Sequence, residues 1–183
     1  MPDLLTGPAF AELFRGFSRS ARRLETRDRY AGDQALFDQW QRGELDEPAL
    51  ADKVAAWLEQ VRASTAAGGR YERVRVVREP PTDYQRFALA TCRASVEAGE
   101  DIRYLPRREA VELALPDHDF WLFDDERLAL LYFTADDRLL GAQVVRDPAL
   151  VGQHRRWFEL AFEAAQPYRE YLAADPARDQ RPR

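Results

Sequence analysis

The stretch Val96–Asp125, VEAGEDIRYLPRREAVELALPDHDFWLFDD, sets the order of elements in the second half of the chain. It indicates a helix end closed by Gly99, a short strand, a linking helix and a second strand that ends in an acidic turn. Its most distinctive runs are Gly99–Pro106 (GEDIRYLP) and Phe120–Asp125 (FWLFDD). No residue in the stretch completes a catalytic or metal-binding constellation.

A strand and a helix precede this stretch and complete a βαβ unit. Tyr71–Val77 (YERVRVV) alternates apolar and charged side chains, as a strand does. Thr82 and Gln85 have the spacing of a capping box, which predicts a helix from there to Ala98. Asp101–Leu105 (DIRYL) is the next strand, so we expect two adjacent parallel strands with the helix packed across them.

Three strands and a closing helix follow in quick succession. The expected strands are Asp119–Phe123, Arg127–Thr134 and Arg138–Val145, and the short acidic turns between them predict an antiparallel meander. Asp147 and Pro148 then begin a long helix. The inner face of this helix should carry Leu150, His154, Trp157, Phe158, Ala161 and Ala165.

The first part of the chain favours helices. Phe10, Leu13, Phe14 and Phe17 share one helical face, and an apolar stripe at helical spacing runs from Leu50 to Val61. The charged run from Ser18 to Asp33 leaves its own conformation open. The glycine pair that ends the AAGG run at residues 66–69 marks the best boundary in the chain.

The expected fold class is therefore α/β. A helical N-terminal layer (residues 1–69) precedes a mixed sheet (residues 70–172), and both belong to one structural unit. The sheet contains the βαβ unit, the antiparallel meander and a closing C-terminal helix, and residues 173–183 are expected to be a disordered tail. Five aromatic residues should be mostly buried and join the helical layer to the sheet: Trp57, Phe87, Trp121, Tyr132 and Trp157.

Composition narrows the class of protein. The chain has 183 residues and a net charge of −5, with 45% hydrophobic and 32% charged residues. An acidic balance disfavours direct nucleic-acid binding, and no apolar run approaches the roughly 20 residues that cross a membrane. The single cysteine, Cys92, excludes an internal disulfide and fits a reducing cytoplasm, so we expect a cytoplasmic protein.

Candidate catalytic and metal-binding residues are few. The only histidines, His118 and His154, with one cysteine, cannot supply a closed zinc shell, so no metal or cofactor is expected. No Walker A or G-x-G-x-x-G motif is present. Five acidic residues at strand ends could hold magnesium or calcium, but ordinary turn chemistry is the favoured interpretation: Glu97, Glu100, Asp101, Asp124 and Asp125.

The best candidate ligand site is the loops that follow the two parallel strands. Ligands of open α/β sheets bind beyond the carboxyl ends of such strands, where loops and helix N-termini converge. Arg78, Glu79 and Thr82 follow the first strand, and Arg107 and Arg108 follow the second. Arginines beside a helix N-terminus favour an anionic group such as a carboxylate or phosphate.

Four motifs together resemble an actinobacterial family that is known as a domain of unknown function. They are Arg23–Tyr30 (RLETRDRY), Glu72–Phe87 (ERVRVVREPPTDYQRF), GEDIRYLP and FWLFDD, and the resemblance runs from about Leu13 to Tyr171. Members of that family are often encoded near small helix-turn-helix regulators. This resemblance implies a regulatory accessory role.

The second half also resembles, more loosely, one half of the phospholipase D-type sandwich. Active members of that superfamily need a His-x-Lys pair. Here His118 is followed by Asp119 and Phe120, so the resemblance implies a catalytically degenerate copy.

We therefore expect a non-enzymatic regulatory accessory protein. Its expected partner is another protein, such as a helix-turn-helix regulator, or a small anionic ligand, with no direct nucleic-acid contact and no membrane. The alternative is an enzyme of phosphoester or nucleotide chemistry that uses carboxylates and arginines.

Overall fold

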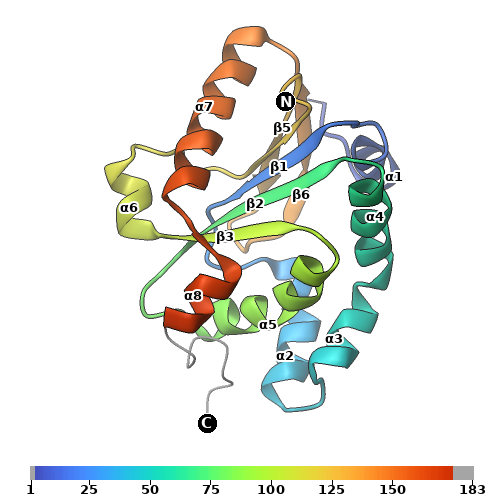
Figure 1. The fold of residues 1–183 in the computed structure, drawn as a ribbon, viewed down its shortest axis with the longest axis vertical. Helices are drawn as coiled ribbons and strands as arrows, with labels where there is room; N and C mark the ends of the chain where they lie inside the picture. Colours follow the sequence, from blue (N-terminus) through green and yellow to red (C-terminus); the bar gives the residue numbers. More distant parts are fainter. Residues whose placement is uncertain (1–2, 175–183) are drawn as a thin grey trace.

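A seven-stranded mixed sheet forms the centre of the computed structural model, which describes residues 3–174 (Figure 1). Its strand order is β6-β5-β4-β1-β2-β3-β7. The strands are β1 (Ser20–Glu25), β2 (Arg70–Val77), β3 (Asp101–Pro106), β4 (Phe120–Phe123), β5 (Arg127–Phe133), β6 (Leu139–Val145) and β7 (Gln166–Pro167). β1, β2 and β3 are parallel, and the remaining pairs are antiparallel. The expected mixed α/β class is confirmed.

The βαβ unit has the predicted geometry. β2 and β3 pair in parallel register, and α5 (Asp83–Glu97) connects them. The helix begins with a reciprocal capping box: Thr82 Oγ1 accepts from Gln85 N at 3.2 Å, and Gln85 Oε1 accepts from Thr82 N at 3.0 Å. These two bonds satisfy backbone donors that the first turn of a helix leaves unpaired.

The sequence patterns did not reveal two strands, the short β7 at the edge of the sheet and the central β1. β1 lies within the charged run whose conformation was open, and it sits between β2 and β4. Its sequence SARRLE lacks the usual alternation, because Arg23 and Glu25 are buried although they are charged. Residues on both sides of Gly69 consequently share one sheet.

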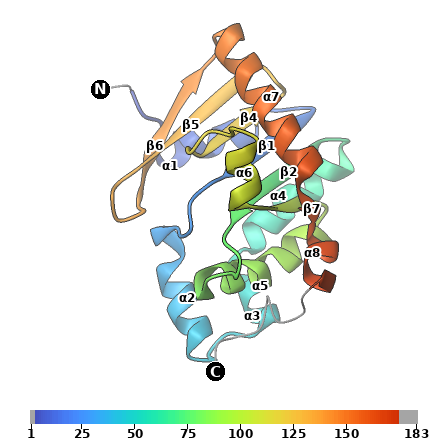
Figure 2. The same ribbon diagram turned by 90° about the vertical axis from the view of Figure 1, so that its left-hand side faces the viewer.

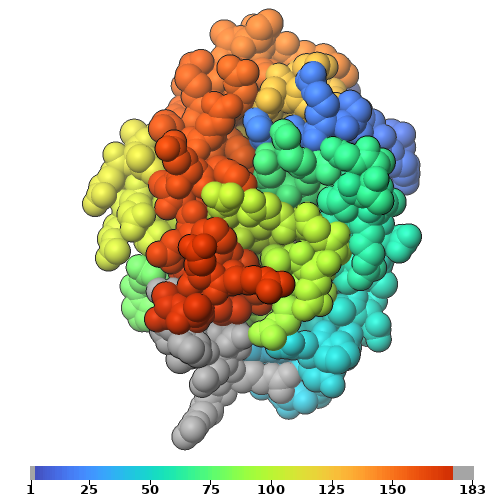
Figure 3. All heavy atoms as spheres, viewed as in Figure 1, coloured from blue at the N-terminus to red at the C-terminus, as the bar shows by residue number. Residues whose placement is uncertain are grey.

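Helices cover both faces of this sheet (Figures 1 and 2). α6 (Arg107–Glu112) and α7 (Pro148–Ala164) pack on the face that carries Leu24, Val74 and Phe120. α7 and α8 (Tyr168–Ala174) form much of the surface that faces the viewer in Figure 3.

The opposite face is covered by α1 (Gly7–Ala11), η1 (Glu12–Phe14) and α4 (Ala55–Ala66). A smaller core joins α5 to α2 (Gln34–Gln41) and α3 (Glu47–Lys53), which lie at the lower end in Figure 2. The short helix η2 (Ala31–Asp33) leads from the β1 loop into α2.

Most of the expected core aromatics are inside, with one exception. Phe87 and Trp121 are buried, and Trp57 and Trp157 are half-buried. The prediction for Tyr132 is wrong, because this residue is 36% exposed and its hydroxyl donates to Gln143 Oε1 at 2.8 Å. It lies at the register shift between β5 and β6.

Two further predictions need correction. Leu150, placed on the inner face of the last helix, is 42% exposed, and its neighbour Val151 is buried instead. The expected tail begins too early, since α8 continues through Ala174, while residues 175–183 lie outside the described residues. Within residues 3–174 no helix combines the length and apolar character that crossing a bilayer requires.

The packing of α7 can be tested by one substitution with a control on the same helix. Phe158 is 1% exposed, so Phe158→Ala should lower the free energy of unfolding by about 3–5 kcal/mol. Leu160 is 46% exposed on the same helix, and Leu160→Ala should change it by about 0.5 kcal/mol or less. Urea unfolding measures both values, and equal effects would contradict this placement of α7.

Candidate ligand-binding site

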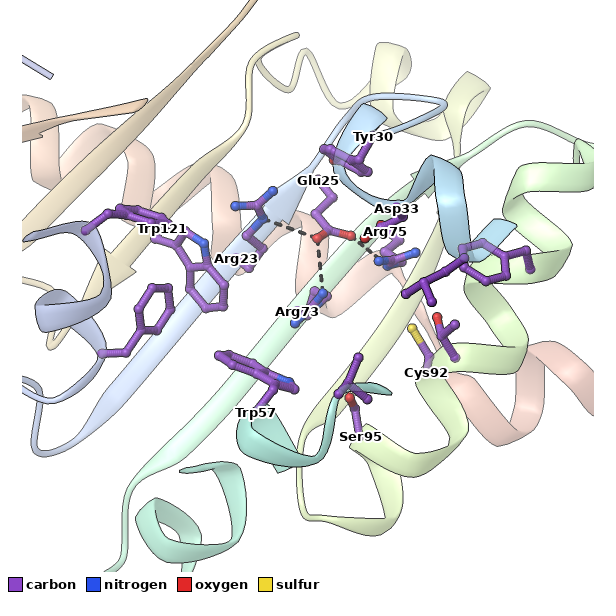
Figure 4. Close-up of a pocket in the computed structure, with 16 residues that line it drawn as sticks. Arg23, Glu25, Tyr30, Asp33, Trp57, Arg73, Arg75, Cys92, Ser95 and Trp121 are labelled. Carbon is purple, nitrogen blue, oxygen red and sulfur yellow. Dashed lines mark hydrogen bonds and ion pairs between the residues drawn. The ribbon is translucent and has the colours of Figure 1, made fainter. Parts of the chain in front are cut away.

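A cavity of about 440 Å³ lies on the sheet face opposite α7. β1, β2 and β4 form its floor, and residues of η1, α4 and α5 form its sides (Figure 4). Figure 4 shows the side chains of Arg23, Glu25, Arg73 and Arg75 standing on the floor, with Trp57 on one side and Cys92 of α5 on the other.

The floor is built from charged residues at alternate strand positions. Side chains two residues apart point to the same face of a sheet, so Arg23 and Glu25 of β1 face the same way. The parallel register places Arg23 beside Arg73 and Glu25 beside Arg75. One carboxylate therefore receives three guanidiniums: Glu25 lies 2.6 Å from Arg75 Nε, 3.1 Å from Arg73 Nη1 and 3.3 Å from Arg23 Nε.

Two of these arginines have a second acidic partner. Arg23 Nη2 donates to Asp119 Oδ2 at 2.9 Å, and Arg73 Nε donates to Glu100 Oε1 at 2.7 Å. Arg75 differs, because among residues 3–174 only the shared Glu25 forms an ion pair with it. The three arginines that line the cavity thus have four carboxylates near them: Glu25 and Asp33 belong to the lining, and Asp119 and Glu100 bind Arg23 and Arg73.

Aromatic rings form the apolar side of the cavity. The Arg73 guanidinium carbon lies 5.8 Å from the ring centroids of both Trp57 and Trp121. The two indole rings are 6.2 Å apart, and Phe14 packs edge-on against each of them. The same arginine is thus held by carboxylates and by cation–π contacts.

Burial and ion pairing shift the pKa values of four ionisable groups in the cavity, Glu25, Tyr30, Arg73 and Arg75. Burial alone would raise the pKa of the Glu25 carboxyl, but Arg75 and Arg73 lower it to about 2. Burial opposes the charge of Arg75 and Arg73, yet the surrounding acidic groups raise both pKa values. Burial, followed by the Glu25 and Asp119 charges, raises the pKa of Tyr30.

The residues of the predicted loop site lie beyond the ends of β2 and β3. An acidic residue of this chain, Asp28, already binds two of the arginines there. Arg78 Nε donates to Asp28 Oδ2 at 2.6 Å, and Arg107 Nη2 donates to Asp28 Oδ1 at 2.8 Å. Arg108 lies 3.8 Å from Glu79, and Thr82 caps α5. Asp28 follows β1, the strand that the sequence patterns missed, and it occupies the position expected for an anion. Ligand binding at these loops stays a prediction.

The two histidines meet on the other face of the sheet. His118 Nε2 and His154 Nε2 are 3.0 Å apart, and His154 Nδ1 donates to the Leu150 carbonyl at 2.8 Å. The second bond fixes the tautomer, so His118 donates to His154 when both are neutral. Burial lowers the pKa of both rings.

Four of the five acidic residues considered as a metal site instead form separate contacts, and Glu97 is exposed. Asp124 accepts from the backbone of Ser18, Arg19 and Ser20, and Asp125 pairs with Arg22. Glu100 and Asp101 bind Arg73 and Arg103. Across residues 3–174 no three His, Cys, Asp or Glu side chains gather in a way that could hold a metal ion.

Comparison with known proteins identifies a family and finds distant similarity to solved structures. Residues 8–173 match the family described as "Domain of unknown function (DUF6879)". The chain belongs to this family. No curated protein matches it. A similar solved structure is TrmBL2, an archaeal chromatin protein, with a TM-score of 0.47 and 13% identity over 85% of this chain and 48% of that one. The chain thus spans about half the length of TrmBL2.

This likeness corrects one expectation. From the acidic composition we expected no direct nucleic-acid partner, but TrmBL2 is described as having "a novel mode of DNA binding". The exclusion of nucleic acid therefore does not stand. With a TM-score below 0.5, the likeness assigns no partner to this chain either.

Acid should destabilise the protein through Glu25. Its pKa of about 2 lies below the ordinary 4.5, so its stabilising contribution is present above pH 4.5 and is lost as pH falls towards 2. The difference corresponds to about 3 kcal/mol. Unfolding free energies measured from pH 6 to pH 2 should show this loss, and Glu25→Gln should remove it while lowering stability at pH 7.

Glu97→Gln is the matched control, because Glu97 is exposed. This variant should keep the pH profile of the unsubstituted protein. A Glu25→Gln profile that matches the control would show that Glu25 is not held as a buried ion.

Proposed function

We propose that this protein is a non-enzymatic regulatory accessory protein that binds a small molecule in the cavity above Glu25. The ligand in this proposal joins an anionic group to an apolar body. The observation that carries the proposal is the placement of Arg75, whose one acidic partner is already shared with Arg23 and Arg73, in a cavity lined by Trp57 and Trp121.

Charge supports an anionic group. Arg75 shares its carboxylate, Glu25, with Arg23 and Arg73, and a planar guanidinium can bind a carboxylate or phosphate through two parallel hydrogen bonds. Because Arg75 is buried among protein atoms, an anion beside it would be screened less than at the surface.

Size and lining support an apolar body. A volume of about 440 Å³ falls in the range of roughly 300–1,000 Å³ that small-molecule sites occupy. Such sites are mostly apolar with a few polar groups that fix orientation. Phe14, Trp57 and Trp121 supply the apolar side here, and Thr91 and Ser95 of α5 add hydroxyl groups opposite.

Protonation states favour binding over catalysis. General acid–base chemistry is most efficient when a group has a pKa near the working pH. Glu25 has a pKa of about 2, and the pKa values of Arg73, Arg75 and Tyr30 are raised. The alternative, an enzyme of phosphoester or nucleotide chemistry, has no such group among these four.

The regulatory part of the proposal follows from a site that binds without reacting. Such a site can act only through the ligand-bound state of the protein, which another macromolecule must recognise. A cytoplasmic location agrees with the single, unpaired Cys92. An actinobacterial origin and a degenerate phospholipase D-like relationship complete the proposal. In the latter, His118 contacts His154 and has no lysine two residues later.

The proposal predicts that charge decides ligand binding. By isothermal titration calorimetry, 2-naphthoate should bind, and its neutral counterpart 2-naphthamide should bind about 10- to 100-fold more weakly, because a charge-assisted hydrogen bond is lost. Arg75→Gln should weaken 2-naphthoate binding by a similar factor. Arg62→Gln removes an exposed arginine on α4 and is the matched control.

Two further variants separate the outcomes. Thr91→Phe fills the cavity from α5 without removing an ion pair, so it should also abolish binding if Arg75→Gln folds poorly. The double change Arg78→Ala with Arg107→Ala should leave binding intact. Loss of binding only in that double variant would move the site to the strand-end loops, and equal affinity for the amide would refute the anionic component.

A further inference from the structure

A second cavity adjoins the first along the same face of the sheet. Its volume is about 330 Å³, and it is lined by Leu131 and Phe133 of β5 and Leu139 of β6. Its lining is more apolar than that of the first cavity, with Asp137 and Arg138 of the β5–β6 turn also contributing. Nothing in the proposed function uses this space.

The two cavities share a border of three residues, Phe10, Arg23 and Tyr30. Arg23 lies on the floor, because it belongs to β1. Phe10 of α1 and Tyr30, which precedes η2, contribute to the lining of both cavities above that floor. Tyr30 is fixed by its hydroxyl bond to Asp119 Oδ2 at 2.6 Å. The two cavities are therefore neighbours, and Arg23 of β1 contributes to the lining of both.

The distance between the two ends follows from the strand order. Arg75 stands on β2 and Leu131 on β5, and β1 and β4 lie between them. Neighbouring strands are about 4.8 Å apart, so the polar end and the apolar end are separated by roughly 14 Å. A compact aromatic acid does not reach across this distance, whereas an extended alkyl chain does.

We infer that the ligand is an extended anionic amphiphile. Its anionic group lies at Arg75, and its alkyl chain passes between Phe10 and Tyr30 into the cavity formed by Leu131, Phe133 and Leu139. This inference rests on the proposed function and adds the class of ligand to it. Arg75, whose carboxylate is shared with two other arginines, at one end and an apolar lining at the other match the two ends of a long-chain carboxylate.

Gly32 provides a way to close the second cavity alone. It lines that cavity, and a Cβ added to it would meet no atom within 4 Å. Gly32→Phe should therefore fill the space without disturbing the core, and Gly32→Ala is the matched control. Leu139→Asp is a second, independent variant, since Leu139 is 42% exposed and tolerates a polar side chain.

The experiment compares dodecanoate, below its micelle-forming concentration, with 2-naphthoate by isothermal titration calorimetry. In the unsubstituted chain dodecanoate should bind at least tenfold more tightly than octanoate, because each buried methylene strengthens binding about fourfold. Gly32→Phe and Leu139→Asp should weaken dodecanoate binding at least tenfold and leave 2-naphthoate unchanged. Gly32→Ala should behave as the unsubstituted chain.

Each contrary result has a separate meaning. If 2-naphthoate binds but dodecanoate gains nothing over octanoate, or keeps its affinity in Gly32→Phe, the inference is overturned and the proposed function stands. If neither 2-naphthoate nor any alkyl carboxylate binds, the proposed function fails and the inference with it. Binding of dodecanoate only as part of anionic lipid vesicles would also overturn the inference, because the chain is then not inside the protein.

Discussion

The contact of Glu25 with three arginines is the interaction on which the rest of the structure depends. It joins β1 to β2, and Arg23 extends the contact to Asp119, the residue that precedes β4. Removing one partner from such a buried cluster leaves an uncompensated charge, which costs about 3–5 kcal/mol. The cluster therefore imposes the parallel register of β1 and β2, and the same register places every charged group of the cavity floor.

The charges of this cluster also limit what the cavity can do. A carboxyl with a pKa of about 2 and arginines with raised pKa values hold their protons or charges throughout the physiological range. Such groups orient a bound ion well but transfer protons poorly. The indole rings of Trp57 and Trp121 also hold the Arg73 guanidinium in place, and they offer an apolar surface to a ligand. This arrangement is the reason why we propose binding rather than catalysis.

Local signals allowed the βαβ unit to be predicted from the sequence. The alternation in Tyr71–Val77 and the capping box at Thr82 depend on neighbours within a few residues, and both were interpreted correctly. β1 was missed because burial of Arg23 and Glu25 depends on Arg73, Arg75 and Asp119, which are distant in sequence.

The same cause limited the prediction of the site. Arg78 and Arg107 do converge beyond the strand ends, as parallel strands require, but Asp28 between them belongs to the loop after the missed strand. The aromatic wall was partly foreseen as core, because Trp57 and Trp121 lie on apolar faces. Their position beside an arginine follows only from the sheet order. The structural role of the charged residues in RLETRDRY follows only from the pairing of β1 with β2.

Crystallography of the protein with bound 6-bromo-2-naphthoate tests the central claim most directly, since bromine marks the ligand position by its anomalous signal. The account predicts one bromine peak inside the cavity near Trp57 and Trp121, with the carboxylate at hydrogen-bonding distance from Arg75. A bromine peak at the loops of Arg78 and Arg107, or ordered ligand only on the outer surface while the cavity stays empty, would contradict it.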